Sequence, residues 1–440
     1  MKLLITLLIV CAFIANGQGQ DFATKADRYL KPYVETGNFS GTVLIAEKGK
    51  IIFHKGYGLA SVELNVPNGL QTKYHIASVS KTFTAAAILL LEQRGLLTTD
   101  DLLSKYIPDY PLGDKITLHH LLSHTSGITN VNNLPEYNDA SLKRQTPESL
   151  IILFKSKPLE FQPGEKYQYS NSNYNVLAFI IEKVSGKRYG EFLHDEIFVP
   201  LKMESTFHHD DATQIITNAA EGYASNGNFG LQKSAHLDWS SKTGNGSLVT
   251  TASDLLLWDR ALYTEKILSA PAKAKMFRQY AGSGYGWYLG QKHDRDCIYM
   301  NGRSPGFSSH IGRYPSDELC VVVLQNSYVS VATQVGFDLA GIALQENVDI
   351  PNLRLSKVKK EESDMVTGKY QFAGDFYQPN FLMTISEKNG SLFSDWGELI
   401  PGETFHYIQR AFWSKVVFVK NPQGNVLSMT FDTYEGKKIN

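Results

Sequence analysis

Ser78 and Lys81 are the pair of side chains with the clearest chemical potential in the sequence. They lie in the run His75–Thr84 (HIASVSKTFT), and Ala85–Leu91, a block of helix-forming apolar residues, follows directly. This pattern predicts a buried helix with Ser78 in its first turn and Lys81 one turn further along the same face. A desolvated, neutral lysine takes the proton of a serine hydroxyl, and a helix N-terminus stabilises an oxyanion. The spacing therefore indicates nucleophilic catalysis, although S-x-x-K alone also fits a helix cap beside a surface lysine.

Two other patterns resemble functional motifs, and we interpret both as structural. Gly302–Gly306 satisfies G-x-S-x-G, but the run Phe307–Tyr314 that follows is typical of a strand, whereas a nucleophile elbow leads into a helix. The histidines at 119, 120 and 124, and the run His208–Asp211, lack zinc-ligand spacing and partner cysteines. We therefore expect no metal and no other cofactor.

The elements that must position Ser78 are strands at both ends of a long region with helices between them. Apolar spacing predicts a first helix over Phe22–Val34, and β-rich runs at Gly41–Ala46 and Ile51–His54 predict a hairpin. Helices are predicted over 102–106, 118–122 (with a stop at Gly127), 147–154 (with Thr146 as cap), 173–184, 251–263, 271–277 and 329–344, and strands over 286–289, 297–300, 307–314 and 319–325. The order implies one antiparallel sheet completed where the two ends of the region meet, flanked by helices and facing an all-α lobe. The predicted fold class is α+β.

A second, smaller domain is expected at the C-terminus. Residues 346–366 are charged and poorly periodic, which is typical of a linker. From residue 367 to 440 the chain consists of short β-like runs separated by turn signals such as Asn389-Gly390. These runs predict a small all-β barrel or sandwich after a main domain spanning residues 22–345.

The first 17 residues have the composition of a secretory signal. Lys2 precedes the apolar run Leu3–Ala15, and small residues follow, so we expect a mature start near Gln18. The run is short for a membrane span. This predicts an exported protein, periplasmic or extracellular, with no stable membrane insertion.

The composition is that of a globular protein with an ample core. The chain has 440 residues, a formal net charge of -1 and 42% hydrophobic residues, and no basic patch or charge run indicates a nucleic-acid partner. Export permits a disulfide between Cys297 and Cys320, but both lie in apolar runs, which favours buried thiols.

Five short motifs occur in an order typical of one enzyme family. They are Ser78/Lys81, LLSHTSG (121–127), Tyr169-Ser170-Asn171, TTASDLLLW (250–258) and Gly302 with Pro305-Gly306-Phe307. Together they resemble the serine β-lactamase and penicillin-binding-protein family, with most similarity to class C β-lactamases and their esterase and D-peptidase relatives. The resemblance covers residues 22–344, and the tail resembles the small β domain often attached to such hydrolases.

The resemblance implies a role for each matching residue. Ser78 would be the acylated nucleophile, Lys81 its proton partner, Tyr169 the general base, and Asn171 the amide that steadies lysine and substrate. A tyrosine with an ordinary pKa of about 10 needs adjacent positive charge to act as a base near neutrality, and Lys81 supplies some. The backbone N–H groups of Ser78 and Arg303 would form the oxyanion hole.

The third motif departs from the family at Met300. It reads Met300-Asn301-Gly302, where the family has Lys-Thr-Gly or His-any-Gly. A thioether carries no charge and hardly accepts a hydrogen bond, so this change removes a group that would hold a substrate carboxylate and lower the Tyr169 pKa. Arg303 has the opposite strand parity, and His310 is another candidate replacement. We expect ester or small-amide cleavage to tolerate this change better than penicillin hydrolysis.

The sequence thus predicts an exported serine hydrolase that cleaves an ester or amide of a small molecule or short peptide through an acyl-Ser78 intermediate. The alternative is a non-catalytic or weakly acylated binding or sensor protein on the same scaffold, because of Met300. A D,D-peptidase acting on cell-wall peptides is a third interpretation. The substrate, the oligomeric state and the role of the tail are left open.

Overall fold

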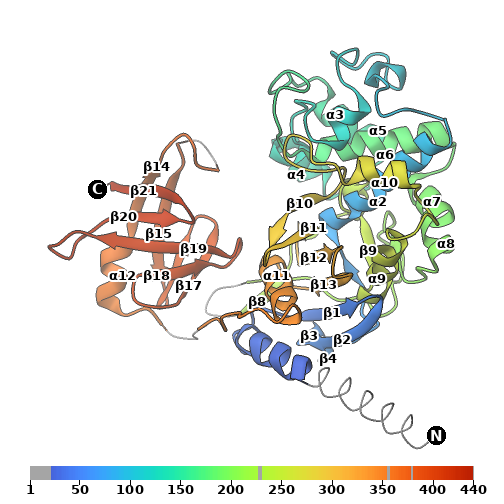
Figure 1. The fold of residues 1–440 in the computed structure, drawn as a ribbon. Helices are drawn as coiled ribbons and strands as arrows, with labels where there is room; N and C mark the ends of the chain where they lie inside the picture. The colour runs from blue at the N-terminus through green and yellow to red at the C-terminus, as the bar shows by residue number, and fades with distance from the viewer. Residues whose placement is uncertain (1–20, 226–229, 354–356, 378–379, 440) are drawn as a thin grey trace, which may run out of the picture.

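The computed structural model describes residues 21–225, 230–353, 357–377 and 380–439. The predicted signal segment, residues 1–17, lies outside the described residues. A larger unit of sheet and helices is followed by a smaller unit of strands (Figure 1). This is the predicted α+β organisation with an added β domain.

The larger unit is built on a six-stranded antiparallel sheet with the order β10-β11-β12-β13-β1-β2. The strands are β1 (Gly41–Glu47), β2 (Lys50–Tyr57), β10 (Tyr288–Lys292), β11 (Arg295–Ser304), β12 (Phe307–Tyr314) and β13 (Leu319–Gln325). Gly41 lies opposite Gln325, and Glu47 lies opposite Leu319. The prediction that the two ends of this region meet in one sheet is therefore confirmed.

Both faces of this sheet are buried, which explains the continuous apolar runs in its central strands. Along β1, Leu44 packs into one core and Val43 into the other. Cys320 lies in the first core and Cys297 in the second, so the two thiols occupy opposite faces of the sheet. Both cysteines are free, and no disulfide joins them.

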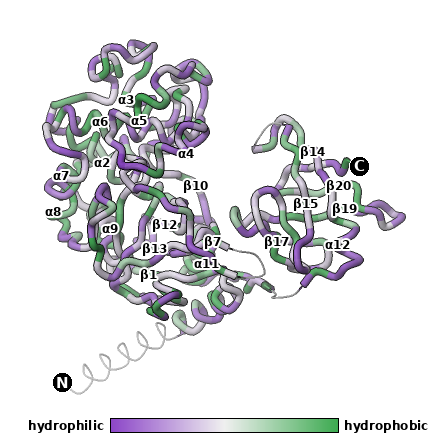
Figure 2. Tube along the Cα trace, turned by 180° about the vertical axis from the view of Figure 1, so that it is seen from behind, coloured by the Kyte–Doolittle hydropathy of each residue, from purple (hydrophilic) through white to green (hydrophobic). Residues whose placement is uncertain are grey.

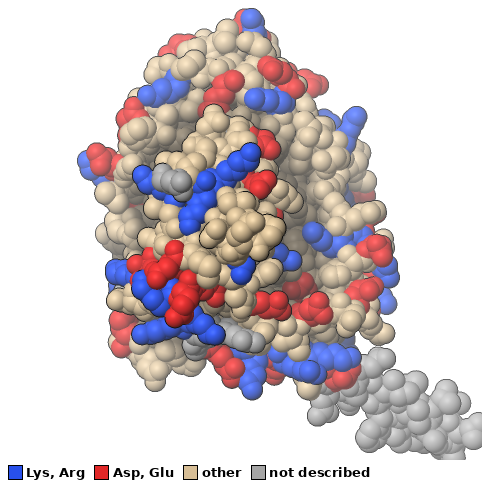
Figure 3. Space-filling view, turned by 90° about the vertical axis from the view of Figure 1, so that its left-hand side faces the viewer, with Lys and Arg blue, Asp and Glu red and all other residues tan. Residues whose placement is uncertain are grey.

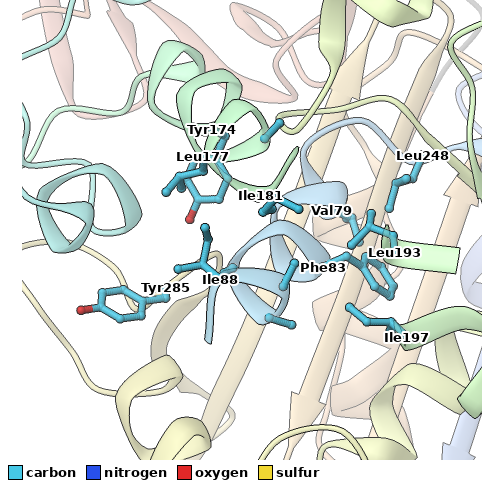
Figure 4. Packing of buried hydrophobic residues seen from close by; sticks show 14 of the residues in the cluster. Val79, Phe83, Ile88, Tyr174, Leu177, Ile181, Leu193, Ile197, Leu248 and Tyr285 are labelled. Atoms are coloured by element: carbon cyan, nitrogen blue, oxygen red, sulfur yellow. The ribbon is translucent and has the colours of Figure 1, made fainter. Parts of the chain in front are cut away.

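Helix α2 (Ser80–Gln93) runs through the middle of the larger unit and is buried on all sides over its first 12 residues. Figure 4 shows Phe83 and Ile88 of this helix packed among side chains of the neighbouring helices, Leu177 and Ile181 of α6 among them. The other helices are residues 21–35, α3 (Leu118–Leu122), α4 (Pro135–Ala140), α5 (Pro147–Lys155), α6 (Asn171–Ser185), α7 (Tyr189–Leu193), α8 (Val199–Leu201), α9 (Ala252–Ala261), α10 (Ala270–Met276) and α11 (Ala332–Ala343). Shorter helical turns are η1 (Ala77–Val79), η2 (Leu103–Lys105), η3 (Val131–Asn133), η4 (His194–Phe198) and η5 (Trp239–Lys242).

Small sheets connect the helical lobe to the segment that precedes α2. The three-stranded one has the order β5-β9-β6, so β9 lies between the two strands that come before it in the chain. The short strands are β3 (Leu59–Ser61), β4 (Val66–Pro67), β5 (Tyr74–His75), β6 (Phe207–His208), β7 (Tyr223–Ser225), β8 (Leu231–Lys233) and β9 (Leu248–Thr250). Strand β5 thus delivers the chain directly to the turn that carries Ser78.

Several helix boundaries follow the capping signals in the sequence. Thr146 accepts a hydrogen bond from the backbone N–H of Ser149, and Pro147 occupies the first turn of α5. Thr251 caps α9 in the same way. The predicted helix over 118–122 is confirmed as α3, and the chain leaves the helix before Gly127, because His124 already has a left-handed backbone with φ 58°.

The C-terminal unit is a closed eight-stranded antiparallel barrel. Its strands are β14 (Gly368–Phe372), β15 (Leu382–Lys388), β16 (Ser391–Ser394), β17 (Gly397–Pro401), β18 (His406–Gln409), β19 (Ser414–Lys420), β20 (Val426–Phe431) and β21 (Tyr434–Ile439). Helix α12 (Lys360–Val366) occupies the end of the interval expected to be a linker, and Val366 packs into the barrel core. Hydrophobic stretches occur in both units (Figure 2).

A buried arginine of the barrel, itself paired with a barrel glutamate, joins the barrel to the larger unit. Arg410 pairs with Glu398 at 2.9 Å, and the same guanidinium donates to Asn38 Oδ1 at 2.7 Å and to the backbone oxygen of Gly37 at 3.1 Å. On the face of the molecule that carries the barrel, basic and acidic side chains lie interspersed (Figure 3). Within the described residues, no helix combines the length and apolar character needed to cross a bilayer.

A second buried ion pair ties α9 to the main sheet. Arg313 Nε lies 2.6 Å from Asp259 Oδ1, and the side chains are 3% and 1% exposed. Burial raises the pKa of Asp259, although the Arg313 guanidinium opposes this shift. The pair therefore matters mainly because each charge would be left uncompensated without the other.

We predict that Asp259→Asn lowers the free energy of unfolding by about 3–5 kcal/mol, because it leaves the Arg313 guanidinium buried without a counter-charge. Urea unfolding followed by circular dichroism measures the effect. The control is Lys25→Met, which breaks a surface pair with Asp21 at 60% and 63% exposure and is expected to cost less than about 1 kcal/mol. Equal losses in the two variants would contradict the prediction.

Candidate active site

Ser78 lies in the one-turn helix η1, which leads without interruption into α2. Two contacts fix this turn: the Ser309 hydroxyl donates to the backbone oxygen of Ile76 at 2.7 Å, and the Leu248 N–H donates to Ser80 Oγ at 3.1 Å. The residue before the serine, Ala77, has a left-handed backbone with φ 46°, a strained conformation for a residue with a Cβ. The predicted placement of Ser78 at the start of a buried helix is confirmed.

Lys81 points from the first turn of α2 toward Ser78. Its Nζ lies 3.1 Å from Ser78 Oγ, 2.8 Å from Asn171 Oδ1 and 2.7 Å from the backbone oxygen of Asn245. The side chain is fully buried, and no carboxylate of the described residues forms an ion pair with it. The two oxygens other than Ser78 Oγ are carbonyl acceptors, which orient the amine without supplying negative charge.

Burial lowers the pKa of Lys81 well below its ordinary value, and the nearby positive charge of Lys242 lowers it further. A neutral amine has two N–H donors and one lone pair. In this geometry, the two donors match the carbonyl oxygens of Asn171 and Asn245, and the lone pair is left to face the hydroxyl of Ser78. The environment therefore suits a neutral lysine that accepts the serine proton.

Tyr169 completes the contacts of the nucleophile. Its hydroxyl lies 2.8 Å from Ser78 Oγ, and Lys81 Nζ is 5.0 Å from the centre of its ring. Burial raises the pKa of Tyr169 above its ordinary value, with Tyr288 raising it further and the Ser78 hydrogen bond opposing the shift. The phenol is therefore held in its protonated form, which differs from the expectation that Tyr169 acts as a phenolate base.

His124 is a residue of this site to which our sequence analysis gave only a packing role. Its ring lies 4.6 Å from that of Tyr169, and its Nδ1 accepts a hydrogen bond from the Ser170 N–H at 3.2 Å. Burial, together with the charge of Lys81, lowers the pKa of His124 to about 3, so the imidazole is neutral with its proton on Nε2. This ring fixes the position of Tyr169 without adding charge.

Asn171 is the first residue of α6, and Ser170 rather than Asn171 is its N-cap. Its side chain links Lys81 to the helical lobe, because its Nδ2 donates to Asn132 Oδ1 at 2.8 Å while its Oδ1 contacts the lysine. The backbone N–H of Asn171 donates to Asn130 Oδ1 at 3.1 Å. Three asparagines from two segments thus hold one acceptor in position.

The third motif passes directly alongside the nucleophile. A Cβ added to Gly302 of β11 would lie 2.3 Å from the Ile76 backbone oxygen and 2.9 Å from the Ser78 backbone nitrogen. Glycine is therefore required for this close approach. On the same face of β11, Met300 lines a small cavity beside Tyr169 and is 3% exposed. The neutral thioether thus occupies the position beside the phenol where the family places a cation.

The remaining third-motif candidates do not reach the cleft with their side chains. Arg303 stacks on Tyr328 at 3.9 Å and on Phe412 of the barrel at 4.5 Å from the ring centres. Its backbone N–H remains the predicted second oxyanion donor. Asn301 has the same strand parity as Arg303 and lies opposite His310 in the β11–β12 pairing, so its side chain belongs to the other face of β11.

His310 is wrong as a substitute for the missing cation. It is buried between Tyr299 of β11 and Phe337 of α11, and burial lowers its pKa to about 3. Ser304 of the G-x-S-x-G pattern ends β11 and pairs with Phe307 across a tight turn between two strands. It therefore does not lie on a strand-to-helix elbow. The described residues contain no group of three or more side chains placed to hold a metal ion.

The contact of Lys81 with the Asn245 backbone oxygen was not predicted. A backbone oxygen leaves no residue-type signature, and only the glycine-rich run Gly244–Gly246 marks this turn in the sequence. His124 was visible within the LLSHTSG motif, but its stacking on Tyr169 depends on the left-handed backbone described above.

Comparison with known proteins agrees with this geometry. A serine, a buried amine and a phenol in mutual contact on this fold define a serine hydrolase. The family model described as Beta-lactamase matches residues 26–344, and the chain belongs to this family. The barrel lies outside the matched region.

The relatives include proteins of similar length. The chain is 27% identical over 433 residues to Penicillin-binding protein 4* of Bacillus subtilis (strain 168), covering 91% of this chain and 94% of the relative. It is 34% identical over 302 residues to the Putative penicillin-binding protein PbpX of the same organism, covering 69% of this chain and 73% of the relative.

Solved structures show the same fold. A penicillin-binding protein from Bacillus halodurans aligns with a TM-score of 0.64 and 27% identity over 72% of this chain and 99% of that one. The D-amino acid amidase from Ochrobactrum anthropi SV3, in complex with D-phenylalanine, aligns with a TM-score of 0.67 over 74% of this chain and 99% of its own. At 22% identity, this second likeness establishes the fold alone.

We predict that Gly302→Ala lowers kcat/KM by about a hundredfold or more, because the added methyl displaces β11 or the Ser78 turn and misaligns the nucleophile. Steady-state kinetics on an activated ester measures the loss. Gly290→Ala is the matched control, since a Cβ at this position of neighbouring strand β10 meets no atom within 4 Å. The prediction fails if the two variants retain similar activity.

Proposed function

We propose that this protein is an exported hydrolase that cleaves an ester or amide through an acyl-Ser78 intermediate. One observation carries the proposal: Ser78 Oγ lies within hydrogen-bond distance of both a buried amine, Lys81, and a phenol, Tyr169. The amine has the lowered pKa of a base, and the phenol has the raised pKa of a proton donor. Their environments thus separate the two roles.

In the acylation step, neutral Lys81 takes the proton of Ser78 as Oγ attacks the substrate carbonyl. The developing oxyanion is stabilised by the backbone N–H groups of Ser78 and Arg303. Tyr169 gives its proton to the leaving nitrogen or oxygen, and the proton that Lys81 took from Ser78 then passes to the phenolate, whose ring centre lies 5.0 Å from Lys81 Nζ. Asn171 and Asn245 keep the amine aligned throughout.

Deacylation uses the same groups in the reverse direction. Water enters the position left by the departed group, next to Tyr169. It loses a proton to neutral Lys81 as it attacks the carbonyl carbon of the acyl-enzyme. Ser78 Oγ then leaves and regains its proton from Lys81. No group outside the described constellation is needed for proton balance.

The substrate class is proposed from the relatives and from the composition of the site. Proteins named as penicillin-binding proteins and a D-amino acid amidase share the fold. The neutral Met300 offers no charge to a carboxylate on the leaving-group side, which favours small amides and esters over penicillins. Export is supported by the apolar N-terminal run of the sequence, residues 3–15.

Met300 also favours a second candidate, a sensor that is acylated but turns over poorly. The cavity that Met300 lines with Tyr169 is small, and the thioether offers a hydrolytic water no charged group to bind. The two candidates share the acylation step and differ in the rate of deacylation.

The test of the proposed function is labelling with a fluorophosphonate probe together with turnover of 4-nitrophenyl esters, nitrocefin and D-amino-acid amides. We expect the intact protein to be labelled and to hydrolyse esters or amides, and Ser78→Ala to do neither. Labelling without turnover of any substrate would favour the sensor. Equal labelling of the intact protein and Ser78→Ala would refute the acyl-Ser78 intermediate.

We predict that Tyr169→Phe lowers kcat on D-amino-acid amides by about a hundredfold, the usual contribution of general acid catalysis. The loss on 4-nitrophenyl esters should be much smaller, because 4-nitrophenolate leaves without a proton. Comparing kcat of the variant on the two substrate types measures the difference. A phenolate base would instead give equal losses on amides and esters, which would restore the base role for Tyr169.

A further inference from the structure

Lys242 lies on the wall of the site that also holds the catalytic amine. It is the last residue of η5 (Trp239–Lys242), and its backbone oxygen accepts hydrogen bonds from the N–H groups of Asn245 and Gly246 at 3.0 and 2.8 Å. The backbone oxygen of Asn245 in turn accepts from Lys81 Nζ. Lys242 is therefore fixed one turn away from a direct contact of Lys81.

The charge of Lys242 is not neutralised by the protein. The residue is 7% exposed, and its Nζ lies 5.1 Å from the centre of the Tyr137 ring. Within the described part of the chain, this Nζ forms no ion pair and donates no hydrogen bond, yet it is not among the fully enclosed unpartnered atoms. A lysine this buried is normally paired with an acid. Its ammonium group therefore lacks an acceptor and keeps a small opening to solvent.

Other observations place this opening at the active site. The backbone oxygen of Lys242 anchors Asn245, whose own backbone oxygen contacts Lys81 Nζ, and the charge of Lys242 adds to burial in lowering the pKa of Lys81. Asn245 Nδ2 is a second buried donor without a partner on the same turn. The opposite wall, next to Tyr169, carries the neutral Met300, and Arg303 stacks toward the barrel. Lys242 Nζ and Asn245 Nδ2 are thus two donors without acceptors on the turn that contacts Lys81.

We propose that Lys242 binds a carboxylate on the acyl portion of the substrate, so that the preferred substrates are esters or amides of acyl groups that carry an anion. This inference rests on the proposed acyl-Ser78 function. The acyl side is assigned because Tyr169, which protonates the leaving group, and Met300 line one cavity, and Lys242 is not one of the residues that line it. Bound carboxylate supplies the counter-charge that Lys242 lacks and the acceptor that this wall lacks.

The test compares matched pairs of 4-nitrophenyl esters that differ only in a terminal carboxylate: the monoesters of succinate, glutarate and adipate against butyrate, valerate and hexanoate. Three acyl-chain lengths are used so that the terminal carboxylate of at least one ester reaches Lys242 when its carbonyl lies at Ser78. The readout is the ratio of kcat/KM for the charged ester to that for the neutral one. Spontaneous cleavage, measured with Ser78→Ala, is subtracted.

We expect the ratio to fall by about tenfold to a hundredfold in Lys242→Met for at least one chain length, the usual effect of losing a hydrogen bond to a charged group. Lys242→Arg should retain the ratio within a fewfold. Lys420→Met removes a lysine that lies 4.0 Å from the ring centre of Phe405 in the barrel and should leave the ratio at the wild-type value. An unchanged ratio in Lys242→Met at all three lengths would overturn the inference.

A binding measurement separates this inference from the proposed reaction. Calorimetry with glutaric acid mono-4-nitroanilide is performed on Ser78→Ala and on Ser78→Ala/Lys242→Met, neither of which requires turnover. Weaker binding by the double variant supports the inference even if the esters are not hydrolysed. Equal binding by the two variants overturns the inference, even if the wild-type protein hydrolyses the esters.

The pH profile on a neutral ester gives a readout that a purely structural lysine would not change. The titratable groups around Lys81 are Tyr169, Tyr174, His124 and Lys242. Lys81 acts in its neutral form, so kcat/KM falls as the pH drops through its pKa. Lys242→Met removes the like charge and should move this fall to higher pH. If this fall of kcat/KM stays at the same pH in Lys242→Met, the charge of Lys242 does not influence Lys81.

Discussion

The whole site depends on keeping one amine out of water without giving it a carboxylate. An ammonium group in such surroundings is strongly destabilised, so the protein stabilises the neutral form of Lys81 and with it a base. The two carbonyl groups that orient the amine come from Asn171 at the start of α6 and from Asn245 after η5. The base therefore exists only when the central helix, the helical lobe and the segment before β9 have all assembled.

The same constraint explains why α2 is apolar on all sides. A helix with one polar face would admit water along that face and would rehydrate the lysine in its first turn. Instead, α6 and the sheet enclose α2, and Ser78 alone of the catalytic pair remains partly open to solvent. Hydrophobic packing is in this sense the source of the reactivity of the site.

Much of this could be predicted because the information is local or periodic. The three-residue spacing of Ser78 and Lys81 fixes their common face, and the alternation along β11 correctly separated Met300 from Arg303. The pairing of β1 with β13 followed from the order of elements along the chain. The stacking of His124 on Tyr169 and the contact of Lys81 with the Asn245 backbone oxygen required backbone geometry that residue types do not encode. Helix α12 was missed because its charged outer face conceals the few residues, such as Val366, that it buries.

The pairing of β1 with β13 has a consequence for synthesis of the protein. Ile45 can pair early with Phe53 of β2, but its neighbour on the other side, Val321, is made much later, so one edge of β1 stays unpaired while the long helical middle emerges. Contacts of such large sequence separation make completion of the sheet a late event in folding. The two ends of this sheet therefore cannot be joined until most of the larger unit has been made.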